Sequence, residues 1–129
     1  EVASSSGDVI LSDGKIDNFQ IGTSSGYVTW KNTESEHISI TAKSGEVNVS
    51  GLGEQTNAEV STGSGDIGIS YGTQPQNLSF KISSGSDDVS VRLDDASYTM
   101  ETSACKQGKI GDGTYSLTVN SDSGTVVIH

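Results

Sequence analysis

Apolar and polar residues alternate along this chain in short stretches that recur at a nearly fixed interval. Counted from the second residue of a recurring Ser-Gly pair, the positions seven and five residues earlier are apolar in every repeat. They are Phe19 and Ile21, Ile38 and Ile40, Ala58 and Val60, Leu78 and Phe80, Tyr98 and Met100, and Leu117 and Val119. The residue between each pair is polar. A period of two is typical of a β-strand with one buried face, so we predict a strand here with these residues inward.

A second short strand is predicted after each Ser-Gly pair, because apolar residues return two and four positions beyond the glycine. They are Val9 and Leu11, Val28 and Trp30, Val47 and Val49, Ile67 and Ile69, and Val126 and Ile128. The fifth repeat reads as carrying two extra residues, which leaves Val89, Val91 and Leu93 inward. In the sixth repeat the stretch Gly108–Gly113 loses the pattern, and we expect a bulge or loop there.

The Ser-Gly pairs end at Gly7, Gly26, Gly45, Gly65, Gly85 and Gly124, and Ala104-Cys105 fills the vacant place. We align Cys105 with the glycines because only that choice keeps Tyr98 and Met100 in register. A fixed period of about 20 residues is the signature of a solenoid. The predicted fold is therefore an all-β, single-domain parallel β-solenoid (β-helix) over residues 1–129, with about six coils of 19–20 residues and two short strands per coil. Each coil is expected to pair with the coils before and after it, with right-handed winding.

Corners are expected on both sides of these strands. Glycine suits the Ser-Gly corner because it reaches positive φ without a Cβ penalty. Just before the first strand of each repeat stands a polar column that we interpret as a stacked turn, since asparagine tolerates the left-handed region. Its members are Asn18, His37, Asn57, Asn77, Ser97 and Ser116.

Charge and composition exclude several partners. The net charge is −10, from 17 acidic and 7 basic residues, and no Lys/Arg cluster exists, so we expect neither nucleic-acid binding nor attraction to anionic membranes. No apolar run is long enough to span a membrane, so this segment should not insert into one. The single cysteine, Cys105, is interpreted as a small structural residue. Val2 already occupies an inward position, so the chain is expected to be a fragment of a longer protein.

The segments Ser-Ser-Gly-Asp-Val at 5–9, Ser-Gly-Glu-Val-Asn-Val at 44–49 and Gly-Ser-Gly-Asp-Ile-Gly-Ile at 63–69 recur along the chain. In these segments the chain resembles a bacterial β-strand repeat family that carries an adhesin label and is also called the toastrack domain. The resemblance implies a right-handed β-helix that follows a membrane-spanning segment in an envelope protein. It implies an extracytoplasmic location, with an anchor upstream of residue 1. It carries no catalytic motif, so it transfers no functional residues.

Candidate chemistry is sparse. Glu46 and Asp66 are predicted to stack outward on neighbouring coils, where paired carboxylates could serve a glycan-processing enzyme. A solvated acidic face explains them equally well. The two histidines, His37 and His129, lie far apart along the stack, so neither a catalytic triad nor a histidine-rich metal site is supported. We assign no catalytic, cofactor-binding or metal residue, and expect the chain not to be an enzyme.

Two further features bear on ligands. Hard oxygen ligands gather in the irregular coils, at residues 87–95 (Asp87, Asp88, Asp94, Asp95) and at Asp112, which leaves calcium open as an alternative to plain acidic loops. Tyr27 is predicted to point outward, where it could stack on a sugar ring, whereas Trp30 is predicted to fill the core.

The leading hypothesis is a non-catalytic, extracytoplasmic interaction module, an adhesin or envelope-stress sensor domain of a membrane-anchored bacterial protein. Its partner would be a protein or a cell-wall polymer. The alternatives are a glycan-processing β-helix enzyme with its site at Glu46 and Asp66, and an inert spacer.

Overall fold

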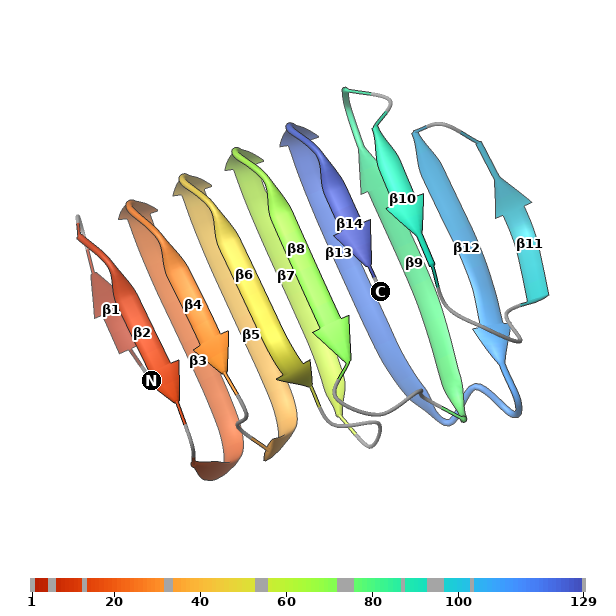
Figure 1. The fold of residues 1–129 in the computed structure, drawn as a ribbon, viewed down its shortest axis with the longest axis horizontal. Coiled ribbons are helices and arrows are strands. Elements are labelled where there is room, and N and C mark those ends of the chain that lie inside the picture. The colour runs from red at the N-terminus through yellow and green to blue at the C-terminus, as the bar shows by residue number, and fades with distance from the viewer. Residues whose placement is uncertain are drawn as a thin grey trace.

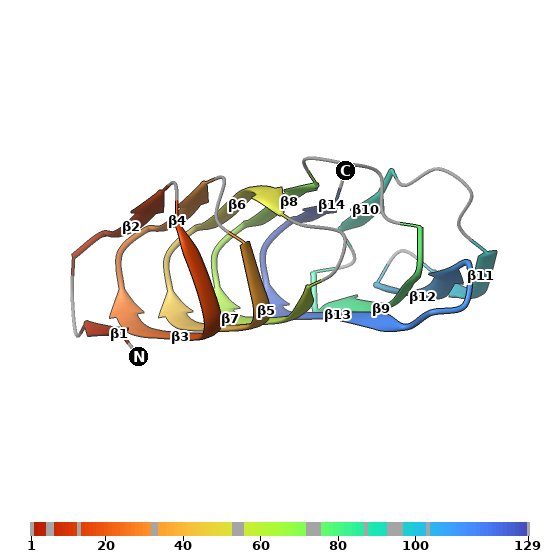
Figure 2. The ribbon, with the colours of Figure 1, turned by 90° about the horizontal axis from the view of Figure 1, so that it is seen from below.

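The structure is a computed structural model that describes residues 2–4, 7–12, 14–31, 34–52, 56–71, 76–86, 88–92, 97–102 and 104–128. All regular secondary-structure elements within these ranges are β-strands. The strands form two sheets that face each other as layers (Figures 1 and 2). None of the described residues belongs to a helix able to cross a membrane.

The first sheet has eight strands, in the spatial order β1-β3-β5-β7-β13-β9-β12-β11. They are β1 (Val2–Ser4), β3 (Lys15–Ser25), β5 (Glu34–Ser44), β7 (Asn57–Ser64), β13 (Tyr115–Ser123), β9 (Leu78–Ser84), β12 (Cys105–Ile110) and β11 (Ser97–Glu101). The second sheet has six strands, in the order β10-β14-β8-β6-β4-β2. They are β10 (Val89–Val91), β14 (Val126–Ile128), β8 (Ile67–Tyr71), β6 (Val47–Leu52), β4 (Val28–Lys31) and β2 (Val9–Ser12). We use the word coil for a strand of the first sheet together with the second-sheet strand that follows it.

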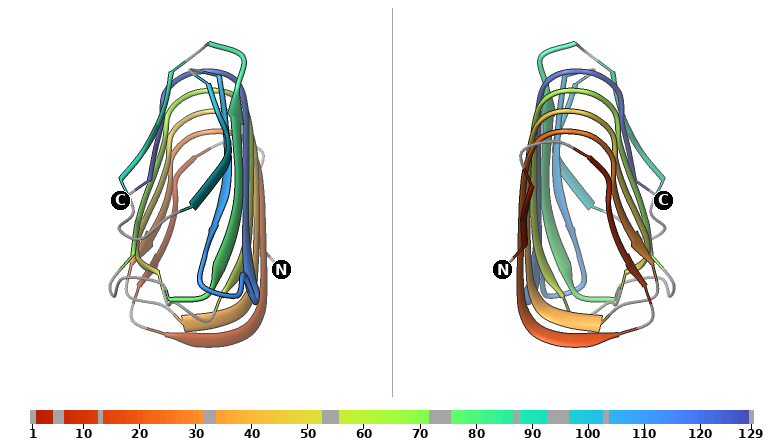
Figure 3. Two further views of the ribbon diagram at one scale, coloured as in Figure 1. Left: turned by 90° about the vertical axis from the view of Figure 1, so that its right-hand side faces the viewer. Right: turned by 90° about the vertical axis from the view of Figure 1, so that its left-hand side faces the viewer.

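The first four coils, β1/β2 to β7/β8, follow one another in chain order and pair in parallel, and successive coils lie behind one another along the long axis (Figure 3). Register partners are 19 or 20 residues apart, as in Ile21↔Ile40 and Ile40↔Val60. This is the predicted period. The predicted inward residues of β3 to β8 belong to a single core, in which Trp30 is fully buried and its ring meets that of Phe19 at 4.7 Å between centroids.

The first-sheet strands run further toward the corner than predicted and add a third inward column. Its members are Thr23, Ala42, Thr62, Ile82 and Ser121, all buried. The buried hydroxyls remain hydrogen-bonded because each donates to a backbone carbonyl two residues on, as Thr23 Oγ1 does to the Ser25 carbonyl at 3.0 Å. Such local side-chain to backbone bonds allow a polar residue to sit inside a narrow core.

The corner glycines behave as predicted in the regular coils. Gly26, Gly45, Gly65 and Gly124 have φ between +119° and +132°. A Cβ on Gly65 would also collide with the carbonyl oxygen of Gly45 in the neighbouring coil. Glycine is therefore required here twice over, by its φ and by the close approach of stacked corners.

The stacking order of the last coils differs from the prediction. The coil formed by β13 and β14, residues Tyr115–Ile128, lies between β7/β8 and β9/β10, and not at the end of the stack (Figure 1). Its register partners are 59 residues earlier on one side, as Leu117↔Ala58, and 37 residues earlier on the other, as Leu117↔Phe80. We call it the closing coil. The expectation that each coil pairs with its neighbours in sequence is wrong here, because parallel pairing needs matching strands and not consecutive ones.

The fifth coil also has a different register from the predicted one. The offset of 37 residues holds from Tyr115↔Leu78 through Val126↔Val89, so no residues are inserted after the corner. The position equivalent to Gly124 is 87, which lies outside the described residues, and Gly85 falls two positions before it. Gly85 accordingly does not have the positive φ of the other corner glycines. The predicted register of this coil was wrong by two residues. Because side chains alternate with a period of two, the inward and outward faces of its described residues were still assigned correctly.

The sixth repeat is not a coil. β11 and β12 form an antiparallel hairpin, and β12 pairs antiparallel to β9 at the end of the first sheet. Tyr98 and Met100, predicted inward, are 37% and 47% exposed, because no further coil covers β11. Cys105 is half-buried at the start of β12, and its amide donates to Thr102 Oγ1 at 2.9 Å in the turn that reverses the chain. Cys105 therefore does not occupy a glycine corner, and Gly108–Ile110 lie in a strand and not in a loop.

The polar column interpreted as a stacked turn lies largely within strands. Asn18 and His37 are register partners inside β3 and β5, whose ladder continues back to Lys15 and Glu34. Asn57 begins β7, and Ser97 belongs to the hairpin strand β11 and not to the column. The strands are longer than the apolar pattern indicated because parallel neighbours continue to supply backbone partners beyond the last core residue.

Candidate functional site

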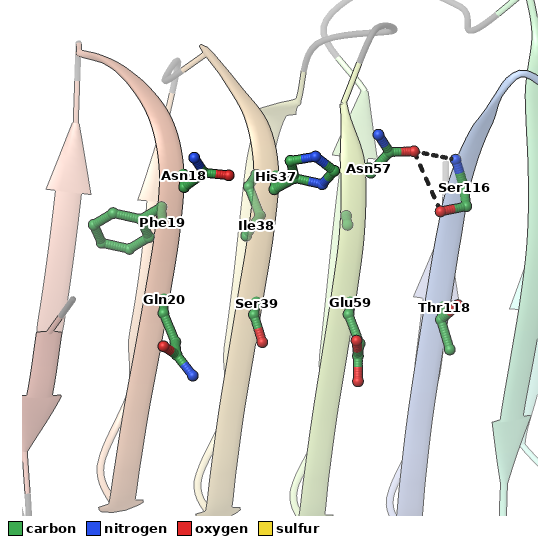
Figure 4. A pocket seen from close by; sticks show the side chains of 11 residues that line it. Asn18, Phe19, Gln20, His37, Ile38, Ser39, Asn57, Glu59, Ser116 and Thr118 are labelled. Carbon is green, nitrogen blue, oxygen red and sulfur yellow. Dashed lines mark hydrogen bonds between the residues drawn. The ribbon is translucent and has the colours of Figure 1, made fainter.

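Two rows of polar side chains cross the outer face of the first sheet, one residue from each of four neighbouring strands (Figure 4). We call them the polar rows. The first row is Asn18, His37, Asn57 and Ser116, and the second is Gln20, Ser39, Glu59 and Thr118. The strands are β3, β5, β7 and β13, so the closing coil supplies the last member of each row.

The rows surround an open depression of about 730 Å³ in the sheet surface. Phe19, Ile38 and Ala58 form its floor between the two rows, with side chains that belong to the core. Since alternate residues of a strand point to opposite faces, the buried positions 19, 38 and 58 fix the flanking positions as outward. The core pattern thus determines which residues line the depression.

The chemistry of the rows is that of hydrogen bonding. The rows contain three amides, one imidazole, three hydroxyls and a single carboxylate, that of Glu59. Asn57 Oδ1 accepts hydrogen bonds from the Ser116 amide at 2.9 Å and from the Ser116 hydroxyl at 3.3 Å. This contact fixes the Asn57 side chain and ties the closing coil to β7. The surface offers both donors and acceptors at the strand spacing of about 4.8 Å.

The acids predicted to stack outward lie on neighbouring coils, as expected, because Val47 and Ile67 are register partners and Glu46 and Asp66 immediately precede them. Each carboxylate has a hydrogen bond in the structure. Asp66 Oδ1 accepts a hydrogen bond from the Thr125 backbone amide at 2.9 Å. Glu46 Oε1 accepts one from the side-chain nitrogen of Asn48 at 3.1 Å. Asp8 repeats the Asp66 arrangement, accepting from the Tyr27 amide at 3.2 Å. Asp8 and Asp66 therefore each satisfy a backbone amide at the corner of the neighbouring coil, whereas Glu46 bonds within its own coil.

Of the acids considered for calcium, the two that the structure describes, Asp88 and Asp112, lie apart. Asp87, Asp94 and Asp95 lie outside the described residues. Asp88 accepts from the Thr125 hydroxyl at 2.9 Å near the corner end of the stack, whereas Asp112 lies in the turn beside Asn77, at the other end of β9. Among the described residues, no three of the types His, Cys, Asp and Glu lie close enough to hold a metal ion.

The other singled-out residues are placed as follows. Tyr27 is 54% exposed, as predicted, at the corner before β4 and away from the polar rows. His37 lies in the first polar row, and His129 lies outside the described residues. The polar rows were not recognised as a site from sequence. The signal was present, since their members occupy the two outward positions that flank an inward column, but half of them were assigned to a turn.

Comparison with known proteins gives one match. The sequence model described as Toastrack DUF4097 matches residues 1–129. No curated protein and no solved structure matches the chain.

Proposed function

We propose that this chain, which belongs to the Toastrack DUF4097 family over residues 1–129, is a non-catalytic interaction module that binds an extended polar partner. The observation that carries the proposal is the pair of polar rows across β3, β5, β7 and β13. A partner lying across the strands would meet one side chain of each row on every strand. A pyranose ring is of the same order of length as the strand spacing of about 4.8 Å, so a wall polysaccharide suits this surface.

The proposal includes a right-handed β-solenoid as the scaffold. It rests on the alternation of successive strands between two sheets and on the view from the N-terminal side (Figure 3, right). In that view the chain rises along the first sheet, descends along the second and recedes in a clockwise sense. Such a scaffold is rigid along its length, which keeps the polar rows in fixed register for a repeating ligand.

We place the module outside the cytoplasm, in the cell envelope of a bacterium, held there by a membrane anchor upstream of residue 1. The support is the sequence resemblance, together with a surface suited to a wall polymer. Protease treatment of intact cells that carry the full-length protein tests this placement. External clipping of the domain is the expected result, and protection of the domain in intact cells but not in lysed ones would contradict it.

Catalysis is left out of the proposal because the candidate carboxylates have structural partners. Asp66 accepts a hydrogen bond from the Thr125 backbone amide of the adjacent coil, and Glu46 accepts one from the side-chain amide of Asn48 on its own strand. The chemistry of the acid column therefore favours a role in the corner over a role in the reaction.

Sedimentation with purified Gram-positive cell walls tests the binding surface. The variant His37→Ala/Glu59→Ala removes one member from each polar row, and we expect it to lower the fraction that sediments with the walls at least several-fold. The matched control is Lys43→Ala/Asp122→Ala, which also removes one carboxylate from exposed positions of β5 and β13, nearer the corner. Melting temperatures of both variants should stay close to that of the parent.

The same experiment separates the module from a spacer. A spacer would not sediment with walls at all, or would lose nothing through either pair of substitutions. Equal loss through both pairs would show that the loss does not depend on the polar rows, and it would contradict them as the binding surface. Protein partners are addressed by repeating the comparison with envelope extract from which walls have been removed.

A further inference from the structure

The closing coil occupies a place that two earlier parts of the chain leave for it. β13 pairs with β7 on one side and β9 on the other, and β14 pairs with β8 and β10. Four of its side chains are completely buried. They are Leu117, Val119, Val126 and Ile128. Between β8 and β9 the chain therefore skips one coil position, and this slot is filled only when residues Tyr115–Ile128 return to it.

The slot is specific for a coil of this shape. Without its occupant, β7 and β9 would each present a row of unpaired backbone groups, and such edges pair with any strand that matches them. The register offsets of 59 and 37 residues are constant across both sheets, so the occupant must carry two strands with the same corner between them. A second copy of this chain carries the one segment known to fit.

We propose that the slot also accepts the closing coil of a second copy, so that two chains assemble by reciprocal exchange of residues Tyr115–Ile128. The paired strands and buried side chains would be the same as in the single chain. The balance between the two forms then depends on the connection to the closing coil and on protein concentration, as in other exchanged dimers.

The connection is a turn of four residues, 111–114, that passes beneath the start of β9. β12 and β13 lie on opposite sides of β9, and Ile110 and Tyr115 both pair with Leu78. Gly111 and Gly113 have positive φ, at +61° and +70°. This turn has to extend for the closing coil to reach another molecule, and four residues can span at most about 14 Å.

Asn77 holds this turn in its folded form. The Asn77 side-chain oxygen accepts the Asp112 amide at 3.2 Å, and its backbone carbonyl accepts the Tyr115 amide at 3.2 Å. Because an extended turn would lose the contact to the side chain, Asn77 favours the closed, single-chain form. Removing that side-chain oxygen should shift the balance toward exchange.

Two chains that each carry one introduced cysteine detect the exchange directly. Both carry Cys105→Ser, one has Lys81→Cys and the other has Thr118→Cys. Positions 81 and 118 are register partners on β9 and β13, and neighbouring strands lie about 4.8 Å apart, within the range that a disulfide bridges. The chains are unfolded together, refolded at high concentration and oxidised. A covalent heterodimer on a non-reducing gel is the expected result.

Two controls bound the result. The pair Gln20→Cys and Ser39→Cys tests β3 and β5, which are consecutive in the first sheet and should not exchange. A single chain with both Lys81→Cys and Thr118→Cys should close an internal disulfide. If it does so while the mixed chains give no more heterodimer than the control pair, exchange is refuted. If it fails to close, the placement of β13 beside β9 is wrong, and the proposal fails with it.

The role of Asn77 has its own comparison. In the Lys81→Cys and Thr118→Cys chains, Asn77→Ala should raise the heterodimer yield several-fold over that of the parent pair. Asn77→Asp keeps an acceptor oxygen for the Asp112 amide and should give a yield near the parent pair. Equal yields from all three would show that the turn does not control exchange, and would overturn this part of the proposal.

Discussion

The first four coils and the last third of the chain are built from the same repeat, yet they stack by different rules. From β1 to β8, each coil lies on the one before it, and partners are 19 or 20 residues apart. From β9 onward, one repeat becomes an antiparallel hairpin and the last returns to the middle of the stack. The difference teaches that a repeat specifies how a coil faces its neighbours, and leaves open which neighbours it takes.

Energetics explain why the unusual order costs little. Raising the separation of paired residues from 20 to 59 increases the entropy cost of loop closure by only about 1 kcal/mol. In return the closing coil gains partners on both sides, while a terminal coil would have a partner on one side. The hairpin β11–β12 then covers the free edge of β9 with antiparallel strands.

The largest expected effect comes from a charge in the closing coil. Val119 and Val60 are register partners, 0% and 1% exposed, so Val119→Asp and Val60→Asp should both abolish cooperative folding. An unpaired buried charge costs several kcal/mol, comparable with the whole stability of a small domain. Circular dichroism melts measure this. A clearly milder effect of Val119→Asp would indicate that β13 sits at an end of the stack.

A smaller effect should distinguish the regular core from the hairpin. Trp30 is fully buried between coils, and Trp30→Ala should lower the free energy of unfolding by about 3 to 5 kcal/mol. Tyr98 is 37% exposed, and its ring lies against that of Phe80 near the end of the stack, at 5.6 Å between ring centroids. Tyr98→Ala should cost about 1 kcal/mol in urea denaturation. Similar costs for both would mean that the hairpin belongs to the main core.

The smallest expected effect concerns the pH dependence of stability at Tyr71, the last residue of β8. Burial raises the pKa of Tyr71, and its hydroxyl has no hydrogen-bond partner among the described residues. The unfolded chain loses this proton near pH 10 while the folded chain keeps it, so stability present below about pH 10 falls as the pH rises further. Tyr71→Phe should reduce that alkaline loss. At neutral pH its unfolding free energy should stay within about 1 kcal/mol of the parent.

Melting temperatures of parent and Tyr71→Phe, followed from neutral pH to about pH 11, give the measurement. Parallel curves for the two proteins would show that Tyr71 ionises as freely in the folded chain as in the unfolded one. The neutral-pH values serve as the control, since both side chains are then uncharged.

Much of the fold could be predicted because whether a residue faces the core depends on the local alternation of apolar and polar residues. Phe19, Ile40 and Val126 are buried where the pattern predicted, and even the shifted fifth coil kept its faces, since the error was two residues. The stacking order could not be predicted in this way. It depends on which strands pair although they are distant in the sequence, and nothing in Leu117 favours its actual partners Ala58 and Phe80 over Tyr98 of the preceding repeat.

The candidate site was harder to recognise because its residues are unremarkable one by one. Ser39, Glu59 and Thr118 are ordinary outward residues of a strand, and only the sheet brings them into a row. The failure at Tyr98 and Met100 has a related cause. Their alternation is genuine, but a strand at the edge of a sheet has no coil beyond it to bury its apolar side.

The position of the closing coil also sets an order of events on the ribosome. Tyr115–Ile128 leaves the exit tunnel after every strand that it joins, so the edges of β7 and β9 that face the slot remain unpaired until these residues arrive. Domains generally acquire structure from the N-terminus during synthesis, and exposed strand edges in that interval attract aggregation and chaperones. A nascent chain stalled before residue 115 would therefore be recognisable to quality control as unfinished.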